Sequence, residues 1–502
     1  MKKVKYISAT IIVWTILAYS GCTPFSNYEL NPNAPSQGQV SPTLVLTSVI
    51  TSTMGAYNPL YGTNYGWAQN IASISSQQGD AGFQGYLGGE ASFGWYSTLR
   101  DVMAMVSEGD RINTAAYKGI GNFFMAYCLI DMSMQMGDIP MSEALKGESA
   151  YNFTPKYDTQ AEVFTQCLSL LEEADTILGA AVEKKVSVGA NELLYGGDVA
   201  KWQKLVNSLR LRILINLSKK ADTETAIGIK SKFAEIVNNP DKHPIFTSND
   251  DNATFRWYDK ENNRYPRFYV QATSDYYRIG NTYYNLIKKY NDPRIAVVAE
   301  RTADAVAANP TASGFDVNEY GGVNCNDSYA SIEASKNAAS IFNRSRYCTP
   351  TGEPMIIVGY PEQCFNIAEA INRGWVAGNA ETYYNEGIRA SMENYGIAES
   401  TIASYLGQSS VNYGNSLEQI LNQKYIAFFN NSGWEAFYNI RRTGIPQLQI
   451  GEGMANPSGK IPVRWRYPQQ EYTTNETNVK AAIQSQFAGS DGVDDVLWIN
   501  KL

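Results

Sequence analysis

The stretch 417–448 constrains the fold more than any other part of the chain, because it marks a helix and the dense cluster that must pack after it. Its first part is a clear amphipathic helix, started by Ser416 and Gln419 at the spacing of a capping box. The polar run 430–433 ends this helix. One apolar stripe recurs at helical spacing: Leu417, Ile420, Leu421, Tyr425, Phe428 and Phe429.

An aromatic and arginine cluster follows directly. Trp434–Tyr438 is succeeded by Arg441 and Arg442. This order predicts guanidinium groups that stack on rings and bond to a carboxylate such as Glu435. We interpret this aromatic and arginine cluster as a structural contact that joins the last helices. Arg441→Ala is therefore expected to lower stability much more than it alters ligand preference.

Helical periodicity dominates the chain up to residue 237. The pattern predicts antiparallel helix pairs, with Asp198 as the N-cap of one helix and small residues such as Gly119 allowing close packing. Residues 238–355 are polar, aromatic and irregular, apart from one short helix. The predicted helices begin at Pro42 and continue over about 65–78, 95–109, 113–136, 161–178, 195–218, 281–294 and 361–397.

The N-terminus has the pattern of an export leader. A basic start precedes an apolar run over 7–18 that is too short for a comfortable membrane span. Small residues then precede Cys22, which resembles a lipoprotein cleavage site. We predict a signal peptide over 1–21, lipidation of Cys22, a tether over 22–40 and one domain over 41–502. Within the domain we expect helix pairs over 41–237, a loop-rich insert over 238–355, and C-terminal helices with a tail over 356–502.

Several motifs resemble those of one known family, the SusD/RagB-like outer-membrane lipoproteins of Bacteroidetes-type bacteria. The matches extend from Asn31 to Asn478 and so cover nearly the whole mature chain. They are the NPN opening with Thr43–Leu44, MGDIPMSEAL, GGDVAKWQKLVNSLRLR, AEAINRGW with YNEGIRASMENYGI, LEQILNQKYIAFF with GWEAFYNIRRTGIP, and the ending PVRWRYPQQE.

The resemblance implies a mostly α fold, an irregular tetratricopeptide-like helix-pair scaffold with long loop-rich insertions that carry the ligand surface. It implies a lipid-anchored cell-surface protein that captures an oligosaccharide and hands it to a SusC-like TonB-dependent outer-membrane transporter. Some members are linked to peptides, so peptide capture by the same lid-on-barrel mechanism is an alternative. A helical-repeat scaffold for protein–protein contacts is a second alternative. Neither an enzymatic activity nor a cofactor is expected.

Charge and motif content argue against other functions. The formal net charge of −8 disfavours a nucleic-acid partner, which needs a basic face. The single histidine, His243, lies in a polar loop, so a Ser-His-Asp triad or a multi-histidine zinc site lacks its usual groups. No acidic pair lies in a glycosidase-like motif. Four residues have a spacing that loosely resembles a calcium-binding loop: Asp316, Asn318, Gly321 and Asp327. Tyr320 stands where an oxygen ligand belongs, so no metal is expected there.

Aromatic residues in the irregular segments are the candidate ligand contacts. Sugar rings pack their C–H faces on Trp and Tyr, while Asn, Asp, Gln and Arg bond the hydroxyls. We expect function in the loops 79–95, 254–280 and 314–347. Charged neighbours around Trp257, Tyr258, Tyr265 and Tyr269 predict ring surface that is not fully buried. The candidate ligand-binding residues are Trp67, Asp80, Tyr86, Trp95, Arg256, Trp257, Tyr258, Tyr269, Tyr276 and Tyr320.

Five cysteines remain besides Cys22, so at least one is unpaired. Cys128 and Cys167 lie in apolar helical patterns and are expected to be buried thiols. Cys325 and Cys348 flank a polar stretch and can form a disulfide if the envelope is oxidising.

Overall fold

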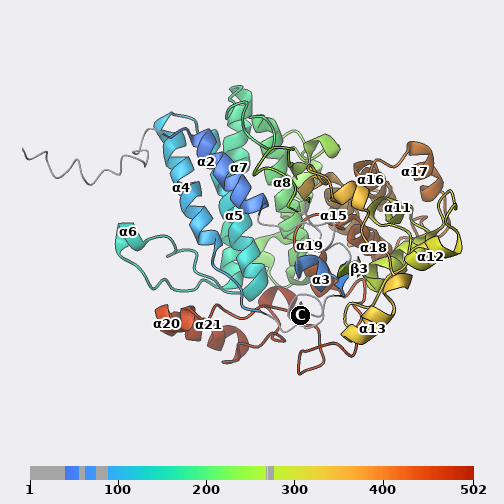
Figure 1. Ribbon diagram of the computed structural model, residues 1–502. Coiled ribbons are helices and arrows are strands. Elements are labelled where there is room, and N and C mark those ends of the chain that lie inside the picture. Colours follow the sequence, from blue (N-terminus) through green and yellow to red (C-terminus); the bar gives the residue numbers. More distant parts are fainter. Residues whose placement is uncertain (1–39, 56–62, 75–88, 267, 269–275, 502) are drawn as a thin grey trace, which may run out of the picture.

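The structure is a computed structural model that describes residues 40–55, 63–74, 89–266, 268 and 276–501. Most of the described chain is helical, and two two-stranded sheets complete it (Figure 1). This confirms the predicted mostly α fold class. The predicted signal peptide and Cys22 lie outside the described residues. Among the described helices, none combines the length and the apolar character that crossing a membrane requires.

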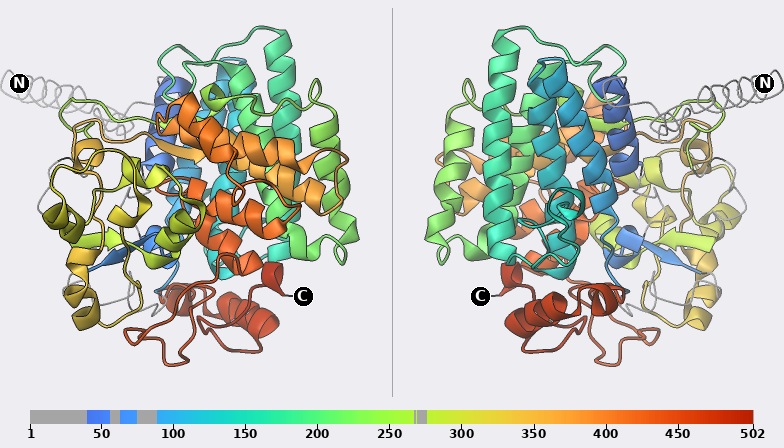
Figure 2. Two further views of the ribbon diagram at one scale, coloured as in Figure 1. Left: turned by 90° about the vertical axis from the view of Figure 1, so that its right-hand side faces the viewer. Right: turned by 90° about the vertical axis from the view of Figure 1, so that its left-hand side faces the viewer.

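The N-terminal half is a row of long helices packed side by side (Figure 2). Each packs on the next helix of the row, as expected for antiparallel helix pairs. Small residues permit the close approach: a Cβ atom on Gly119 would lie 2.8 Å from Leu178 Cγ. The row consists of α2 (Pro42–Met54), α4 (Trp95–Arg111), α5 (Ala116–Met136), α7 (Gln160–Glu183), α8 (Val199–Asn216) and α9 (Ile229–Asn238).

Local sequence signals start these helices. Thr159 and Glu162 form a complete capping box at α7, and the Asp198 side chain accepts from the backbone amides of Ala200 and Lys201 at α8. The helix predicted over 65–78 is wrong over 68–74, because α3 (Thr63–Trp67) ends there and a strand follows; residues 75–78 lie outside the described residues. The short α6 (Gly147–Ala150) lies in the connection between α5 and α7.

Residues 238–355 contain several short helices and strands, with irregular stretches between them. Strand β1 (Ile71–Ser73) pairs with β3 (Tyr277–Ile279), and β2 (Ala253–Phe255) pairs with β4 (Met355–Val358), both antiparallel. The predicted short helix is present as α10. The helices of this region are α10 (Asn281–Tyr290), α11 (Arg294–Val298), α12 (Ala303–Ala308), α13 (Tyr329–Ala334) and α14 (Arg344–Tyr347).

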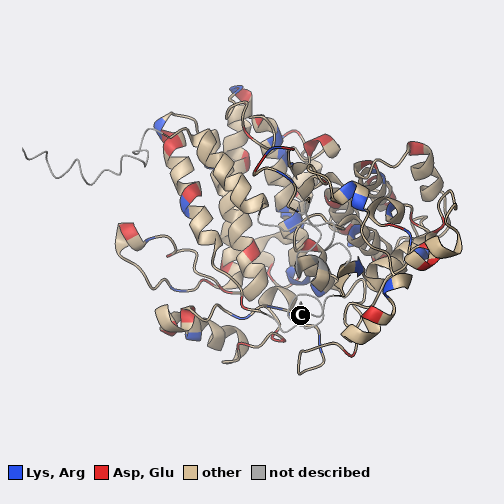
Figure 3. Cartoon of the chain, viewed as in Figure 1, with Lys and Arg blue, Asp and Glu red and all other residues tan. Residues whose placement is uncertain are grey.

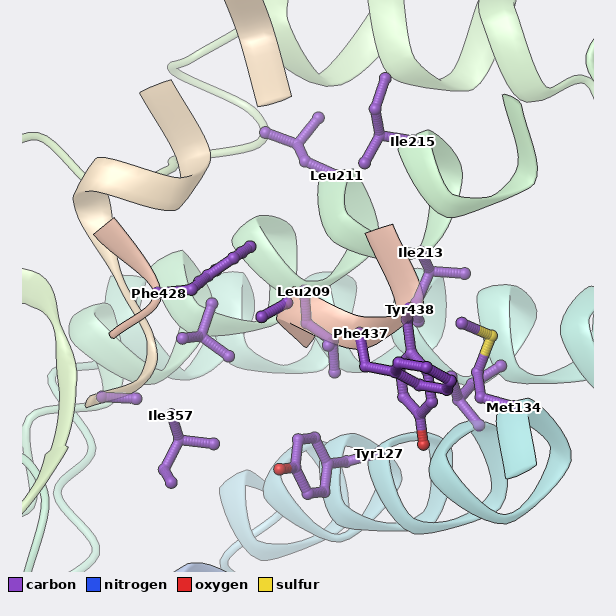
Figure 4. Close-up of a cluster of buried hydrophobic side chains, with 14 of the residues drawn as sticks. Tyr127, Met134, Leu209, Leu211, Ile213, Ile215, Ile357, Phe428, Phe437 and Tyr438 are labelled. Atoms are coloured by element: carbon purple, nitrogen blue, oxygen red, sulfur yellow. The ribbon is translucent and has the colours of Figure 1, made fainter. Parts of the chain in front are cut away.

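The C-terminal helices pack against the N-terminal row through α15, which contacts α8. Figure 4 shows Phe437 and Tyr438 of α19 beside Tyr127 and Met134 of α5, below Leu209 of α8. The hydrophobic core therefore runs continuously from the first helices to the last. The C-terminal helices are α15 (Tyr360–Asn372), α16 (Ala380–Asn394), α17 (Glu399–Leu406), α18 (Leu417–Ala427), α19 (Glu435–Thr443), α20 (Glu471–Thr474) and α21 (Glu476–Phe487).

Helix α18 starts where the capping signal places it, but its surroundings differ from the prediction. The Ser416 hydroxyl accepts from the Gln419 amide, whereas the Gln419 side chain accepts from the Gly414 amide and not from Ser416. Beyond its first turn the helix is buried on its polar face too, since α10, α15 and α16 pack around it. Gln423 and Lys424 are therefore inside the protein.

The two arginines of the aromatic and arginine cluster, Arg441 and Arg442, have different partners. The Arg441 guanidinium lies 4.9 Å from the ring centre of Tyr438, which confirms the predicted stacking. Arg442 makes the carboxylate contact, but its partner is Glu369 of α15 and not Glu435. Its Nη1 and Nη2 donate to the two Glu369 oxygens at 2.5 and 2.8 Å. Both side chains are almost fully buried, so this ion pair joins α15 to α19 without solvent.

Replacing Arg442 by alanine is expected to lower the free energy of unfolding by about 3–5 kcal/mol, because a buried carboxylate loses its main partner. Urea denaturation followed by circular dichroism measures the change. Arg389→Ala is the matched control, since Arg389 pairs with Glu399 at the surface and its loss costs at most about 1 kcal/mol. Equal losses in the two variants would contradict the structural role of the buried pair.

The same ion pair predicts a pH dependence. Burial alone would raise the pKa of Glu369, but the charge and hydrogen bonds of Arg442 outweigh it and hold the pKa at about 2. A carboxyl whose folded-state pKa is depressed stabilises the protein above its unfolded pKa, here 4.5, and loses that contribution as the pH falls toward 2. Wild-type unfolding free energy should fall across this window. The Glu369→Gln variant should show a shallower slope, and an unchanged slope would contradict the assignment.

Candidate ligand-binding site

The β1–β3 sheet joins two of the segments in which we expect function. Its register pairs Ser73 with Tyr277, and the Ile74 amide donates to the Tyr276 carbonyl at 2.7 Å. The end of β1 and the start of β3 therefore lie side by side. The segments 75–88 and 269–275, which attach at this end of the sheet, lie outside the described residues. The described ends of the two segments, Ile74 and Tyr276, are thus hydrogen-bonded neighbours.

The third expected segment, 314–347, lies along the free side of β3. The Ile279 amide donates to the Ser340 carbonyl at 2.9 Å, and the Val323 amide donates to the Ile279 carbonyl at 3.0 Å. A separate small apolar core forms under these contacts. All three segments therefore converge on one sheet, held by the cluster Ala72, Ile74, Val323, Cys325, Ile332 and Ala339.

Three candidate residues present side chains to solvent. Tyr276, at the loop end of the sheet, is 49 % exposed, and Tyr258 is 52 % exposed. Arg256 is also exposed, just after β2. The neighbouring Arg278 is buried and donates from Nε to the Lys336 carbonyl at 3.0 Å, which attaches the third segment to β3. Tyr276 is thus an open aromatic ring on a fixed support.

Two tryptophans that we expected at the ligand surface are in the core. Trp257 is 9 % exposed, and its ring meets those of Phe255 and Tyr265 edge to face, at 5.3 and 5.0 Å. Tyr265 is buried as well, so the expectation of exposed ring surface at Trp257 and Tyr265 is wrong. Trp67 stacks on Trp465 at 4.6 Å and is also buried. Trp67 is covered by aromatic rings from distant segments, whereas Trp257 packs on the rings of Phe255 and Tyr265, which are close in the sequence.

The other candidates are half-buried or lie outside the described residues. Trp95 begins α4, and its Nε1 donates to Asp131 Oδ2 at 2.8 Å, so its polar edge serves the helix packing. Tyr320 is half-buried, with its ring centre 6.4 Å from that of Phe315. The residues outside the described part are Asp80, Tyr86 and Tyr269.

The polar residues weighed in the sequence have structural contacts. His243 is buried and bonded to Asp175 rather than exposed in a loop. Cys325 and Cys348 are free thiols, so the suggested disulfide is wrong; the Cys325 thiol instead donates to the Ile71 carbonyl at 3.1 Å. Burial raises the pKa of the Cys325 thiol. Asp316 accepts from the Asn318 amide at 2.9 Å and so caps a short turn.

Sequence reasoning missed a groove at the opposite end of the same sheet. It has a volume of about 420 Å³ and lies between α10, the first turn of α18 and the segment 444–449. The one available signal was the helical spacing of Thr282, Asn285 and Lys289 in α10. That spacing resembles any solvated helix face, and the other walls come from segments far along the chain.

Charge does not favour an ionic ligand over the surface as a whole. Figure 3 shows Lys and Arg interspersed with Asp and Glu on most elements. The sheet and the groove instead offer aromatic, amide and hydroxyl groups. These groups hydrogen-bond or pack against a neutral polar molecule.

Comparison with known proteins identifies the family. Residues 32–468 match the model of a SusD-like family described as starch-binding and associating with the outer membrane. A Bacteroides vulgatus outer membrane protein whose description names nutrient binding is 32 % identical, with a TM-score of 0.82, 92 % of this chain covered and 100 % of that chain. A SusD homologue from Bacteroides fragilis is also 32 % identical, with a TM-score of 0.80 and the same coverage.

More distant structures share the fold alone. A chitin-binding SusD homologue from Flavobacterium johnsoniae is 18 % identical, with a TM-score of 0.73, 92 % of this chain covered and 98 % of that chain. The search of curated proteins finds no match. The family model matches most of the chain. Two bacterial homologues match this chain over their own full length. The protein therefore belongs to the SusD-like family of nutrient-binding, outer-membrane-associated proteins.

Proposed function

We propose that the protein captures an oligosaccharide at the cell surface and passes it to a SusC-like TonB-dependent transporter in the outer membrane. The observation that carries this proposal is the family match over residues 32–468, whose description names starch binding and the outer membrane. The chitin-binding description of a homologue with the same fold supports a glycan as the ligand class.

The geometry of the β1–β3 sheet supports capture rather than bond chemistry. The Tyr276 ring offers an apolar face of the size of a sugar ring, directly before a strand whose main chain is bonded on both sides. Binding and release need no nucleophile or general base. We therefore propose a non-enzymatic carrier, in which handover follows from a lid-type movement of this protein on its transporter.

The location follows from the leader. We propose that Cys22 carries the lipid and that residues 22–40 act as a tether, which leaves the domain in water above the membrane. Such a tether lets the domain remain attached while it opens and closes over a barrel. The loop-bearing sheet would then face the space between the two proteins.

Glycan capture is tested by calorimetric titration of the purified mature chain with maltoheptaose, chitohexaose and hexa-alanine. We expect binding to one of the two glycans. Tyr276→Ala should weaken it roughly tenfold, about 1.4 kcal/mol, because the sugar loses its stacking face. Tyr151→Ala is the control, since Tyr151 is 83 % exposed beside α6, outside the sheet region. Binding to hexa-alanine alone would favour the peptide alternative and contradict glycan capture.

Lipid anchoring is tested by cell fractionation. Cys22→Ser should move the protein out of the outer-membrane fraction, because serine provides no thiol for the lipid. Cys348→Ser serves as the control, since that thiol is free and half-buried. Retention of the Cys22→Ser protein in the membrane at the wild-type level would contradict a lipid anchor at this residue.

A further inference from the structure

The groove between α10 and α18 has the chemistry of a ligand site that the proposed function does not use. Its walls are one face of α10, the start of α18 and the chain after α19. We propose that this groove is a second glycan-binding site, which takes a neutral sugar unit. The proposal rests on the proposed function for the ligand class, but it concerns different residues from those at Tyr276. The groove is lined by Thr282, Asn285, Leu286, Lys289, Glu418, Asn422, Gly444, Ile445, Pro446, Gln447 and Gln449.

Three amide side chains at the groove have no hydrogen-bond partner within the described part of the chain. Asn285, Gln447 and Gln449 make no side-chain hydrogen bond to any residue in the described part of the chain. By contrast, the buried Gln423 side chain accepts from Arg294 at 2.7 Å and donates to the Tyr405 hydroxyl at 2.9 Å. An amide offers both a donor and an acceptor, as a sugar hydroxyl does. The groove thus keeps paired donors and acceptors available.

A buried amide on the groove wall has weak contacts. Asn422 is only 2 % exposed, yet its Nδ2 donates at 3.5 Å to the Tyr290 hydroxyl and at 3.4 Å to Glu418. Both distances exceed the usual range for an N–H···O bond. Buried polar groups normally have good partners, because their desolvation is otherwise costly. A ligand hydroxyl in the groove would supply the missing short bond.

The wall of the groove is held in place before any ligand arrives. The buried Gln69 side chain donates from Nε2 to the Gln449 carbonyl at 2.7 Å and accepts from the Gln449 amide at 2.8 Å. Asn326 donates to the same carbonyl at 2.7 Å, and Thr282 donates to Gln69. The segment after α19 is therefore tied to the start of β1, to α10 and to the third loop segment. A preformed wall lowers the entropy cost of binding.

The charges at the groove favour a neutral ligand. Lys289 and Glu418 are paired at 3.5 Å, and both remain exposed. The pair leaves no net charge to attract an anion or a cation. Leu286, Ile445 and Pro446 supply apolar contacts for C–H groups. A peptide is disfavoured because the walls are two helices and an irregular segment, with no strand edge to pair with an extended chain.

Two variants test the groove on the full mature chain, with chitohexaose, maltoheptaose and hexa-alanine as probes. The double variant Asn285→Ala/Gln447→Ala removes two unpartnered amides, and Asn285→Trp fills the groove with a ring. Both variants are expected to lower the affinity for the glycan at least fivefold, as measured by calorimetry. Asn238→Ala is the matched control, an exposed asparagine in α9 that should bind as the wild type does. Equal melting temperatures will show that the fold is intact.

The outcomes separate this inference from the proposed function. Glycan binding that is weakened by Tyr276→Ala but unchanged in both groove variants overturns the groove site and leaves the proposed function standing. Loss of hexa-alanine binding in the groove variants, with glycan binding unchanged, assigns the groove to peptides and overturns the glycan site. A wild-type protein that binds neither glycan overturns both proposals. Weakened glycan binding in the groove variants, with the control unchanged, supports the second site.

Discussion

The buried ion pair between Arg442 and Glu369 fixes the position of α19, and the rest of the molecule depends on that position. Helix α19 and the residues before it hold α3: Asn64 donates to the Gly433 carbonyl at 2.8 Å, and Trp67 meets Phe437 edge to face at 5.3 Å. Because α3 leads directly into β1, the sheet that gathers the loop segments is placed by the same contacts. A charge pair deep in the C-terminal half thus positions a surface that begins near residue 70.

Buried polar contacts fix the positions of other helices too. A buried polar group needs a specific hydrogen-bond partner, whereas an apolar side chain packs against several alternatives. Asp131 accepts hydrogen bonds from Trp95 of α4, Gln135 of α5 and Tyr438 of α19. Burial raises the pKa of Asp131, and the three donors lower it in part. Such a group contributes little net stability, since its desolvation is costly. What it adds is a unique arrangement of three helices, which a ligand surface built from separate segments requires.

The sequence predicts what local interactions determine. Helix starts at Asp198 and Ser416 follow from side chains within three residues, and both are present. The motifs also identify the family. Two failures concern partners far along the chain: Trp67 is covered by Trp465, and Arg442 pairs with Glu369 instead of the nearby Glu435. Charged neighbours in sequence say nothing about such partners, so exposure could not be predicted residue by residue.

The geometry of the candidate sites could not be predicted from the sequence for the same reason, since it depends on contacts between distant segments. The three loop segments are predicted to carry function, but only the β1–β3 pairing and the hydrogen bonds of Ile279 to Ser340 and Val323 show that they meet. The groove is made of ordinary Asn, Gln and Thr residues that no spacing distinguishes. Its character arises because Gln69 ties the chain after α19 to the start of β1. Gln69 stands next to the sheet that carries Tyr276, so the two proposed contacts share one rigid support. A sugar chain bound at both ends would therefore be held in a fixed direction across the sheet.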